Sequence, residues 1–303
     1  MNGNLTRVIR ILSEGLIDVD RREGNHGKTP LMVAAQLGDC RIFRFLIRKG
    51  ANKSQVDNDG NNILHWACKG GHVGMEECIL PHYRININNK KVTPLVQAAF
   101  RGYRDVCEFL ACMGANVSQV DDDGDSILHW ACKGGYLGMV KYLLSLCNLD
   151  INCQGKGGNT PLMYAVLWRR KDICEFLMSM GANMSQVNDN NNNVLHIASM
   201  LERLDVMKSL LLQGSVDINS RGMHGKTALM NAAYHGKRKM FDLLVSQGSM
   251  TNLVDDDGHT ILHLASLGGH VEMVKYILSQ NMTDINARDK DGKTAAMIAK
   301  LRI

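Results

Sequence analysis

One eleven-residue pattern, Gly-Asp-Ser-Ile-Leu-His-Trp-Ala-Cys-Lys-Gly at 124–134, recurs with small changes along almost the whole chain. Further copies begin at Gly60, Asn191 and Gly258. A sister pattern, of the type Gly-Lys-Thr-Pro-Leu-Met, alternates with these copies and begins at residues 27, 91, 158, 225 and 292. The nine starts lie 31 to 34 residues apart, and a period of this size indicates a stacked array of helical units.

Every copy carries the same signals for the start of a helix. Its third position always bears a side chain that can cap a helix, in the order Thr29, Asn62, Thr93, Ser126, Thr160, Asn193, Thr227, Thr260 and Thr294. Proline follows directly in three copies, at the helical position where a missing N–H costs nothing. Each unit therefore predicts a short first helix, a glycine turn, a second helix and a hairpin tip rich in Asp and Gly.

The run Gly-x-Thr-Pro-Leu-Met/His-x-Ala, a turn glycine, an aliphatic helix, Gly-Ala-Asn and an Asp-rich turn together resemble the ankyrin repeat over nearly the whole chain. The resemblance implies an all-α solenoid of stacked helix-turn-helix units joined by β-hairpin-like loops. We expect a single domain, 1–303, with half-repeats at 1–26 and 292–303. The full repeats are expected at 27–59, 60–90, 91–123, 124–157, 158–190, 191–224, 225–257 and 258–291.

The repeats also alternate in pairs of about 67 residues. Odd repeats have Met or Val where even repeats have His, and three even repeats end in Asp-Ile-Asn. Duplication of a two-repeat block explains this order most simply. Two neighbouring repeats depart from the pattern, since Arg169 replaces the usual turn glycine and the segment 199–203 also lacks one. We expect the region from Arg169 to Arg203 and the incomplete ends to be the weak points of the array.

Composition narrows the possible partners and compartments. A net charge of +5 in 303 residues is too mild to indicate a nucleic-acid partner. The nine cysteines are an odd number and all lie between Cys40 and Cys174, which favours reduced thiols in the cytoplasm, with the nucleus as the alternative. No leader is visible, and the apolar runs are too short for a membrane span. We expect a monomer that does not enter a membrane.

One repeat is crowded with potential zinc ligands, namely His65, Cys68, His72, Cys78 and His82. The position of the first cysteine, however, is serine in two other even repeats. A position that exchanges cysteine with serine indicates a small, tolerant site, whereas structural zinc needs four converging ligands. The resemblance implies instead that the histidine supports the helix start and the adjacent loop. We therefore expect no metal.

The acidic turns at 57–60, 121–124 and 255–258 look like the start of a calcium loop, but the bidentate Glu at the twelfth position is missing. They are expected to be solvated hairpin tips. The chain also lacks a phosphate loop, a nucleophile elbow and a dinucleotide fingerprint. These absences predict a protein that is not an enzyme, with no catalytic residue and no cofactor.

The leading hypothesis for function is a scaffold, such as a signalling adaptor, that binds a protein or peptide on its concave face, as solenoids do. The alternative is the recognition arm of a larger multidomain enzyme, receptor or signalling protein. If Leu128, Ala131 and Cys132 face the core, helical spacing turns Trp130 and Lys133 toward the groove. The predicted binding residues are Trp66, Lys69, Phe100, Arg101, Trp130, Lys133, Tyr164, Leu167, Trp168, Arg169, Met200 and Tyr234.

This surface contains all three tryptophans of the chain, and Trp and Arg dominate interface hot spots. An alternative is open for Trp66, Trp130 and Tyr164, which could fill gaps between neighbouring first helices. Trp168 and Arg101 are the strongest candidates for binding. The resemblance further implies hydroxylation by an asparaginyl hydroxylase at Asn152, Asn219 and Asn286, and at Asn88 with an imperfect match. The alternative is that these asparagines only bond the hairpin backbone.

Overall fold

The computed structural model describes residues 18–79, 93–146 and 149–300. Within these residues the regular structure is helical, with two 3-10 turns and one isolated β-bridge between Glu23 and Lys28. This confirms the predicted all-α architecture. The chain forms two compact units, Met1–Leu149 and Asp150–Ile303. The single domain and the repeat boundaries stay predictions.

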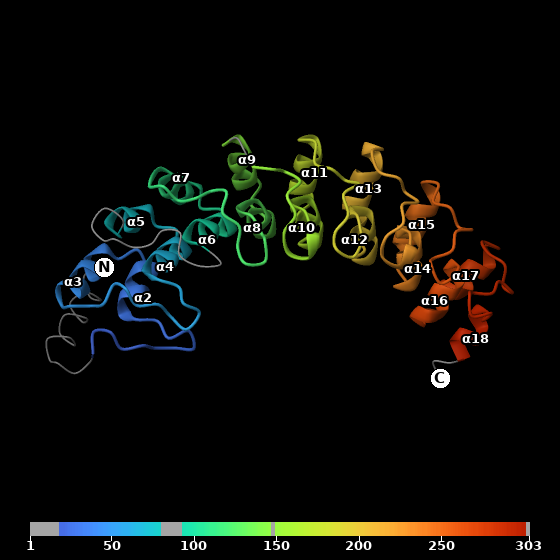
Figure 1. Cartoon of the computed structure of the whole chain (residues 1–303), viewed down its shortest axis with the longest axis horizontal. Helices are drawn as coiled ribbons and strands as arrows, with labels where there is room; N and C mark the ends of the chain where they lie inside the picture. Colours follow the sequence, from blue (N-terminus) through green and yellow to red (C-terminus); the bar gives the residue numbers. More distant parts are fainter. Residues whose placement is uncertain (1–17, 80–92, 147–148, 301–303) are drawn as a thin grey trace. The chain divides into compact units, whose positions relative to one another are not determined.

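In the first unit, the helices form two layers (Figure 1). The first helices of the repeats are α2 (Pro30–Gln36), α4 (Ile63–Gly70), α6 (Pro94–Arg101) and α8 (Ile127–Gly134). The second helices are α3 (Cys40–Arg48), α5 (Val73–Ile79), α7 (Arg104–Cys112) and α9 (Leu137–Ser145). Helix α4 packs between α2 and α6, and α6 packs on α8, while α5 packs between α3 and α7. The core lies between the two layers.

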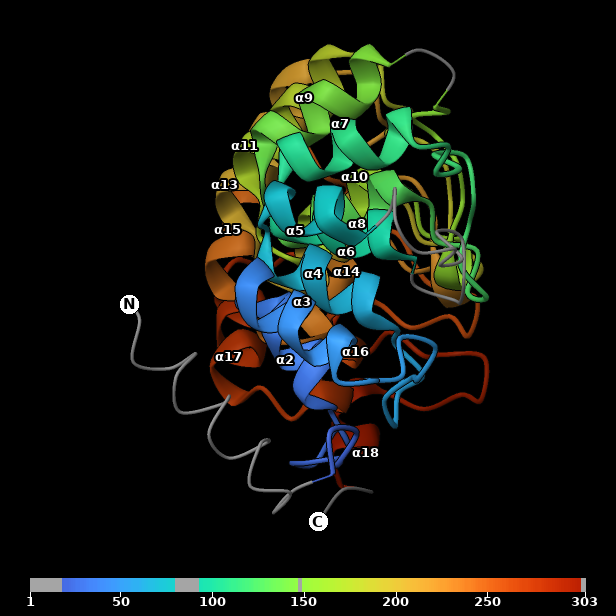
Figure 2. The ribbon, with the colours of Figure 1, turned by 90° about the vertical axis from the view of Figure 1, so that its left-hand side faces the viewer.

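The second unit repeats this arrangement. Its first helices are α10 (Pro161–Leu167), α12 (Val194–Met200), α14 (Ala228–Tyr234), α16 (Ile261–Gly268) and α18 (Ala295–Lys300). Its second helices are α11 (Lys171–Ser179), α13 (Leu204–Gln213), α15 (Arg238–Ser246) and α17 (Val271–Ser279), which form one row along an edge of the unit in Figure 2. The 3-10 turns η1 (Lys156–Gly158) and η2 (Met223–Gly225) lie in its loops.

The predicted caps begin the first helices. Each of the first eight capping residues is the N-cap of its helix, as predicted. The hydroxyl of Thr29, for example, accepts the backbone N–H of Met32 at 3.3 Å. Such a bond satisfies a donor that the first turn leaves without a partner inside the helix.

Glycine ends several first helices of even repeats because neighbouring backbones come very close. A Cβ atom at Gly70 would lie 2.1 Å from the carbonyl oxygen of Gln36, and one at Gly134 would lie 2.2 Å from that of Phe100. Gly268 has the same constraint in the second unit, at 2.1 Å. A side chain at these positions would push the first helices apart, which explains one element of the alternation between odd and even repeats.

The turn between the two helices of a repeat is covered by a ring from the next repeat. The turn glycines Gly38 and Gly236 have positive φ, and a Cβ at either would lie 2.5 Å from the ring of His72 or His270. At the fifth repeat the turn residue is Arg169, which keeps a positive φ of 58°. The sixth repeat also has no aromatic or histidine ring at the position equivalent to His72.

Arg203 occupies the position of that ring. Its guanidinium donates to the carbonyl oxygens of Val166 at 3.4 Å and Leu167 at 3.2 Å, at the end of α10. In the next repeat, Glu202 holds a φ of 54° and pairs with Lys237 at 3.5 Å. Charged contacts thus replace the glycine and ring in the two repeats that depart from the sequence pattern.

Replacing Arg169 with glycine is expected to raise the free energy of unfolding of the second unit by about 1 kcal/mol, since the left-handed conformation costs other residues about 1–2 kcal/mol. Urea unfolding followed by circular dichroism measures this change. Gly38→Ala is the matched control with the opposite sign, because its Cβ would meet the ring of His72. A less stable Arg169→Gly variant would show that contacts of the arginine outweigh its backbone cost.

Candidate functional site

The predicted binding residues of the first unit lie on α4, α6 and α8. Lys69, Phe100, Arg101 and Lys133 are half-buried toward the ends of these helices. Trp66 differs from them, because only 1% of its surface is exposed. These residues therefore occupy similar positions on successive first helices, but Trp66 is buried while the others are partly exposed.

Trp66 contacts one acidic, two basic and one aromatic side chain. Its indole Nε1–H donates to Oδ2 of Asp57 at 3.0 Å. The ammonium nitrogens of Lys28 and Lys69 lie 3.8 and 4.3 Å from the centroid of its ring, which is the geometry of a cation–π contact. The ring of His26 approaches at 6.2 Å with an edge-to-face orientation. These contacts make Trp66 part of the packing of the first two full repeats.

Trp130 repeats this arrangement in a more open form. Its Nε1–H donates to Asp121 at 3.0 Å, and Lys133 lies 4.5 Å from its ring centroid. Phe100 packs edge-to-face on it, with ring centroids 5.9 Å apart. Trp130 is half-buried, so part of its ring is available at the surface.

The aspartates that bind these indoles correct one prediction. The hairpin tips are solvated at Asp59, Asp122 and Asp123, but the first residue of each tip is not: Asp57 and Asp121 are 3% and 9% exposed. A buried carboxylate needs hydrogen-bond partners, and besides the indole each accepts a backbone N–H four residues later, at 2.7 and 2.9 Å. The spacing of nine residues between aspartate and tryptophan was the signal in the sequence that could have revealed this pairing.

In the second unit, the predicted binding residues differ in how much of their surface is exposed. Tyr164 is buried, with 8% of its surface exposed, and Leu167, Met200 and Tyr234 are half-buried. Trp168 follows α10 directly, and 47% of its surface is exposed. Its neighbour Arg169 is also exposed.

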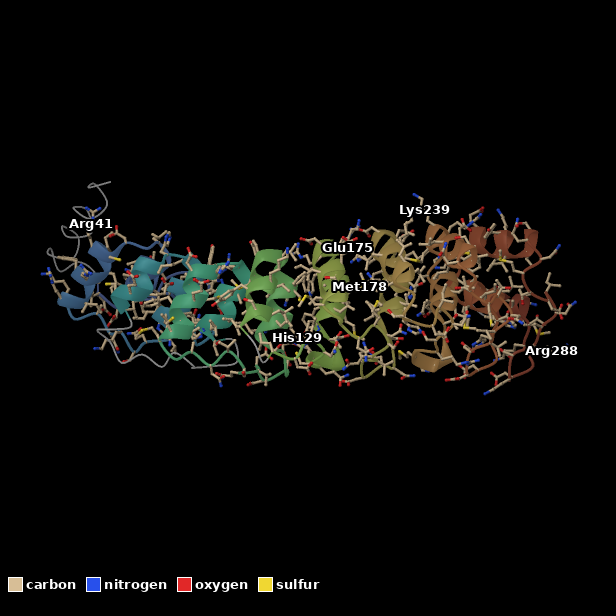
Figure 3. All side chains as sticks on the ribbon, turned by 90° about the horizontal axis from the view of Figure 1, so that it is seen from above. Arg41, His129, Glu175, Met178, Lys239 and Arg288 are labelled. Atoms are coloured by element: carbon tan, nitrogen blue, oxygen red, sulfur yellow. The ribbon has the colours of Figure 1, made fainter. Side chains whose placement is uncertain are left out.

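The histidines of the even repeats act in the fold. In each of these repeats the histidine Nδ1 accepts the N-cap backbone N–H, at 3.1 to 3.2 Å for His65, His129, His196 and His263; His129 is labelled in Figure 3. Nε2 of His196 donates to the carbonyl oxygens of Ser220 and Lys226 at 3.0 and 3.1 Å. Burial lowers the pKa of His196, although these two bonds oppose the shift. The histidine thus supports the helix start and the next loop, as predicted.

Among the described residues, one group of potential metal ligands comes together, Asp255, Asp257 and His259. Oδ1 of Asp255 accepts the backbone N–H groups of Asp257 and His259 at 3.0 and 2.8 Å, and its Oδ2 lies 3.2 Å from the ring nitrogen of His259. The same bonding occurs at Asp121, where no histidine is present. The cluster is therefore explained by the turn. His82 of the zinc set lies outside the described residues.

Two of the candidate hydroxylation sites accept a backbone hydrogen bond from the next repeat. The side-chain oxygen of Asn152 accepts the backbone N–H of Asn183 at 2.7 Å, and that of Asn219 accepts the N–H of Met250 at 2.9 Å. Asn286 is exposed, and Asn88 lies outside the described residues. These bonds agree with a role in the hairpin backbone, and hydroxylation stays a prediction.

Sequence reasoning missed Glu76 on α5. Its surface is fully buried, and in the part of the chain that the structure describes neither carboxylate oxygen has a nitrogen or oxygen donor as its partner; the weakly donating thiol of Cys68 lies beside it. Burial raises its pKa to about 7. The equivalent residues of two other even repeats are the buried Val140 and Met207. A comparison of even repeats at this position would have identified the carboxyl group as an exception.

Comparison with known proteins adds family evidence. A family model described as ankyrin repeats (3 copies) matches residues 31–121, 113–188, 180–253 and 229–301. The crystal structure of the human ASB11 ankyrin repeat domain is similar, with a TM-score of 0.64 and 28% identity over 73% of this chain and 99% of that one. Among the described residues, none of the helices has both the length and the apolar character that a membrane span requires.

Similar curated proteins are much longer than this chain. Transient receptor potential cation channel subfamily A member 1 of Homo sapiens is 27% identical over 267 residues, which is 88% of this chain and 19% of the channel. Palmitoyltransferase AKR1 of Lachancea kluyveri is 30% identical over 176 residues, 57% of this chain and 24% of that protein. The chain thus spans about a fifth to a quarter of these relatives.

Proposed function

Because the chain belongs to the ankyrin-repeat family, we propose that it is a non-catalytic scaffold that binds a protein or peptide on the surface at the ends of its first helices. The observation that carries this proposal is the 47% exposure of Trp168. A large aromatic side chain left at the surface next to Arg169 has the composition of an interface hot spot.

The half-buried residues Lys69, Arg101 and Lys133 give the same surface of the first unit a positive character. Charges on an interface steer a partner toward it and select against partners of the same sign. We propose that the protein acts as a monomeric adaptor in the cytoplasm or nucleus. The eight cysteines that the structure describes are free thiols, which is consistent with such a compartment.

A second candidate function is the recognition arm of a larger enzyme, receptor or signalling protein. It is favoured by relatives such as the cation channel and the palmitoyltransferase, of which this chain spans only a part. Sequencing the full transcript separates the two functions. Stop codons flanking this reading frame would remove the second candidate, and an open frame into a further domain would support it.

The test of partner binding is alanine substitution of Trp168 and of Arg101, with melting temperature and partner capture measured on the same samples. Both variants are expected to lose most of the captured partner, roughly tenfold or more, because truncating a hot-spot residue costs about 2 kcal/mol or more. Their melting temperatures should stay close to that of the unmodified protein.

Leu212→Ala is the matched control, since Leu212 is 88% exposed and lies on the second helix α13. It removes an exposed apolar side chain from a helix that contributes no predicted binding residue, so capture should be unchanged. Capture that survives both test substitutions would place the interface elsewhere on the molecule.

A further inference from the structure

Two lysines from successive repeats lie over Trp66, and Arg101 of the following repeat acts electrostatically on one of them, Lys69. Lys28 precedes α2, Lys69 lies near the end of α4, and Arg101 is the last residue of α6. The two lysine ammonium groups lie over the indole at 3.8 and 4.3 Å. Burial lowers the pKa of Lys69, and the charges of Arg101 and Lys28 lower it further. Like charges are thus held near one another in a partly desolvated place.

The nearby carboxylates are already engaged. Asp57 and Asp59 are the acidic groups that act on Lys69. Asp57 is buried and binds Asn61 and the indole of Trp66. Asp59 lies 3.0 Å from Nδ1 of His26. Each carboxylate is therefore shared with other partners.

Arg101 has an unsatisfied donor. Its Nε atom is buried and has no hydrogen-bond partner within the described ranges. A buried guanidinium N–H without an acceptor is costly, so the hydrogen-bonding capacity of Arg101 is not fully satisfied within the fold. This observation concerns hydrogen bonding and is independent of the crowding of charge around Lys69.

The repeat architecture does not require this cluster. The position of Lys69 is lysine again at 133 but methionine at 200 and leucine at 267. The position of Arg101 is leucine at 37, tryptophan at 168 and histidine at 235. Asparagine stands at 159 in place of Lys28. All three cations coincide once among the full repeats, although lysine recurs singly at 133, 226 and 293.

We propose that Lys28, Lys69 and Arg101 form a binding site for the carboxylate side chains of an acidic peptide segment. The inference rests on the proposed function, and it names the chemistry of the partner for the first unit. Arginine offers its planar donors to a carboxylate in two parallel bonds, and the ammonium groups add charge attraction. A bound carboxylate would reduce the repulsion between the like charges around Lys69.

The test uses the full chain and a fluorescein-labelled peptide of six glutamates, with binding followed by fluorescence anisotropy at low ionic strength. Lys69→Gln and Arg101→Gln are each expected to weaken binding about tenfold, because hydrogen bonds to charged groups contribute on that order. Lys69→Arg keeps the charge and should bind within about twofold of the unmodified protein. Its retained binding separates loss of charge from loss of packing on Trp66.

Lys239→Gln is the control for net charge, because Lys239 is exposed and projects outward from α15 (Figure 3). It should change binding by less than about twofold. Equal weakening in this control, or no binding of hexaglutamate by the unmodified protein, overturns the proposal. Inorganic tripolyphosphate that binds where hexaglutamate does not would also overturn it, in favour of a phosphate site.

The two proposals fail separately. If hexaglutamate binds with the expected charge dependence but capture survives at Trp168→Ala and Arg101→Ala, the proposed partner surface is wrong and the anion site remains. If capture is lost while hexaglutamate does not bind, the scaffold function remains and the acidic character of the partner is wrong.

Discussion

Replacing Glu76 with methionine is expected to stabilise the first unit, and the gain over the unmodified protein should grow with pH. The folded-state pKa of about 7 lies above the ordinary value of 4.5. The part of the free energy of unfolding that depends on the protonation of Glu76 is therefore fully present below about pH 4.5. It is lost as the pH rises through 7. A shift of this size corresponds to roughly 3 kcal/mol between the two limits. Urea unfolding at several pH values measures the difference.

Two controls separate charge from size and position. Methionine already fills the equivalent position at Met207, so Glu76→Met keeps the volume of the core. Glu76→Gln removes only the charge and should abolish the pH dependence while leaving a buried polar group. Glu77→Gln changes an exposed neighbour and should have little effect. An unmodified protein whose stability is flat between pH 5 and about 8 would contradict the raised pKa and its cause, burial.

Trp66→Ala is expected to lower the free energy of unfolding of the first unit by about 4 kcal/mol, within the range for a large aromatic residue removed from a core. The residue is 1% exposed and donates to Asp57. The variant leaves both a cavity and a buried carboxylate that has lost one of its partners. Urea unfolding followed by circular dichroism measures the loss.

Trp168→Ala is the matched comparison, because it makes the same chemical change at a residue that is 47% exposed. Its effect should stay within about 1 kcal/mol. Trp66→Phe keeps one aromatic ring but loses the indole donor and the volume of the second ring, so its cost should be intermediate. Similar losses of stability at Trp66 and Trp168 would show that exposure does not separate structural from binding tryptophans in this chain.

Helical spacing predicted where the binding residues lie on their helices, but it did not predict how exposed each of them is. The pattern placed Trp66 and Trp130 at one structural position, since their repeats share the run from Ile to Gly. Their environments differ, because the ammonium of Lys28 lies over Trp66, whereas Phe100 packs edge-to-face on Trp130. A side chain from the preceding repeat therefore changes the environment of an otherwise identical helix.

The sequence by itself determined the repeat fold, the helix starts and the turns, because these depend on local chemistry. A cap such as Thr29 bonds an N–H three residues away, and the turn glycines hold a conformation that other residues avoid. The tertiary structure decided how completely Glu76 is buried, that Lys28 and Lys69 lie over Trp66, and that Arg203 pairs with the end of α10. Burial of Glu76 depends on packing among neighbouring helices, and the other two features on contacts between repeats about thirty residues apart.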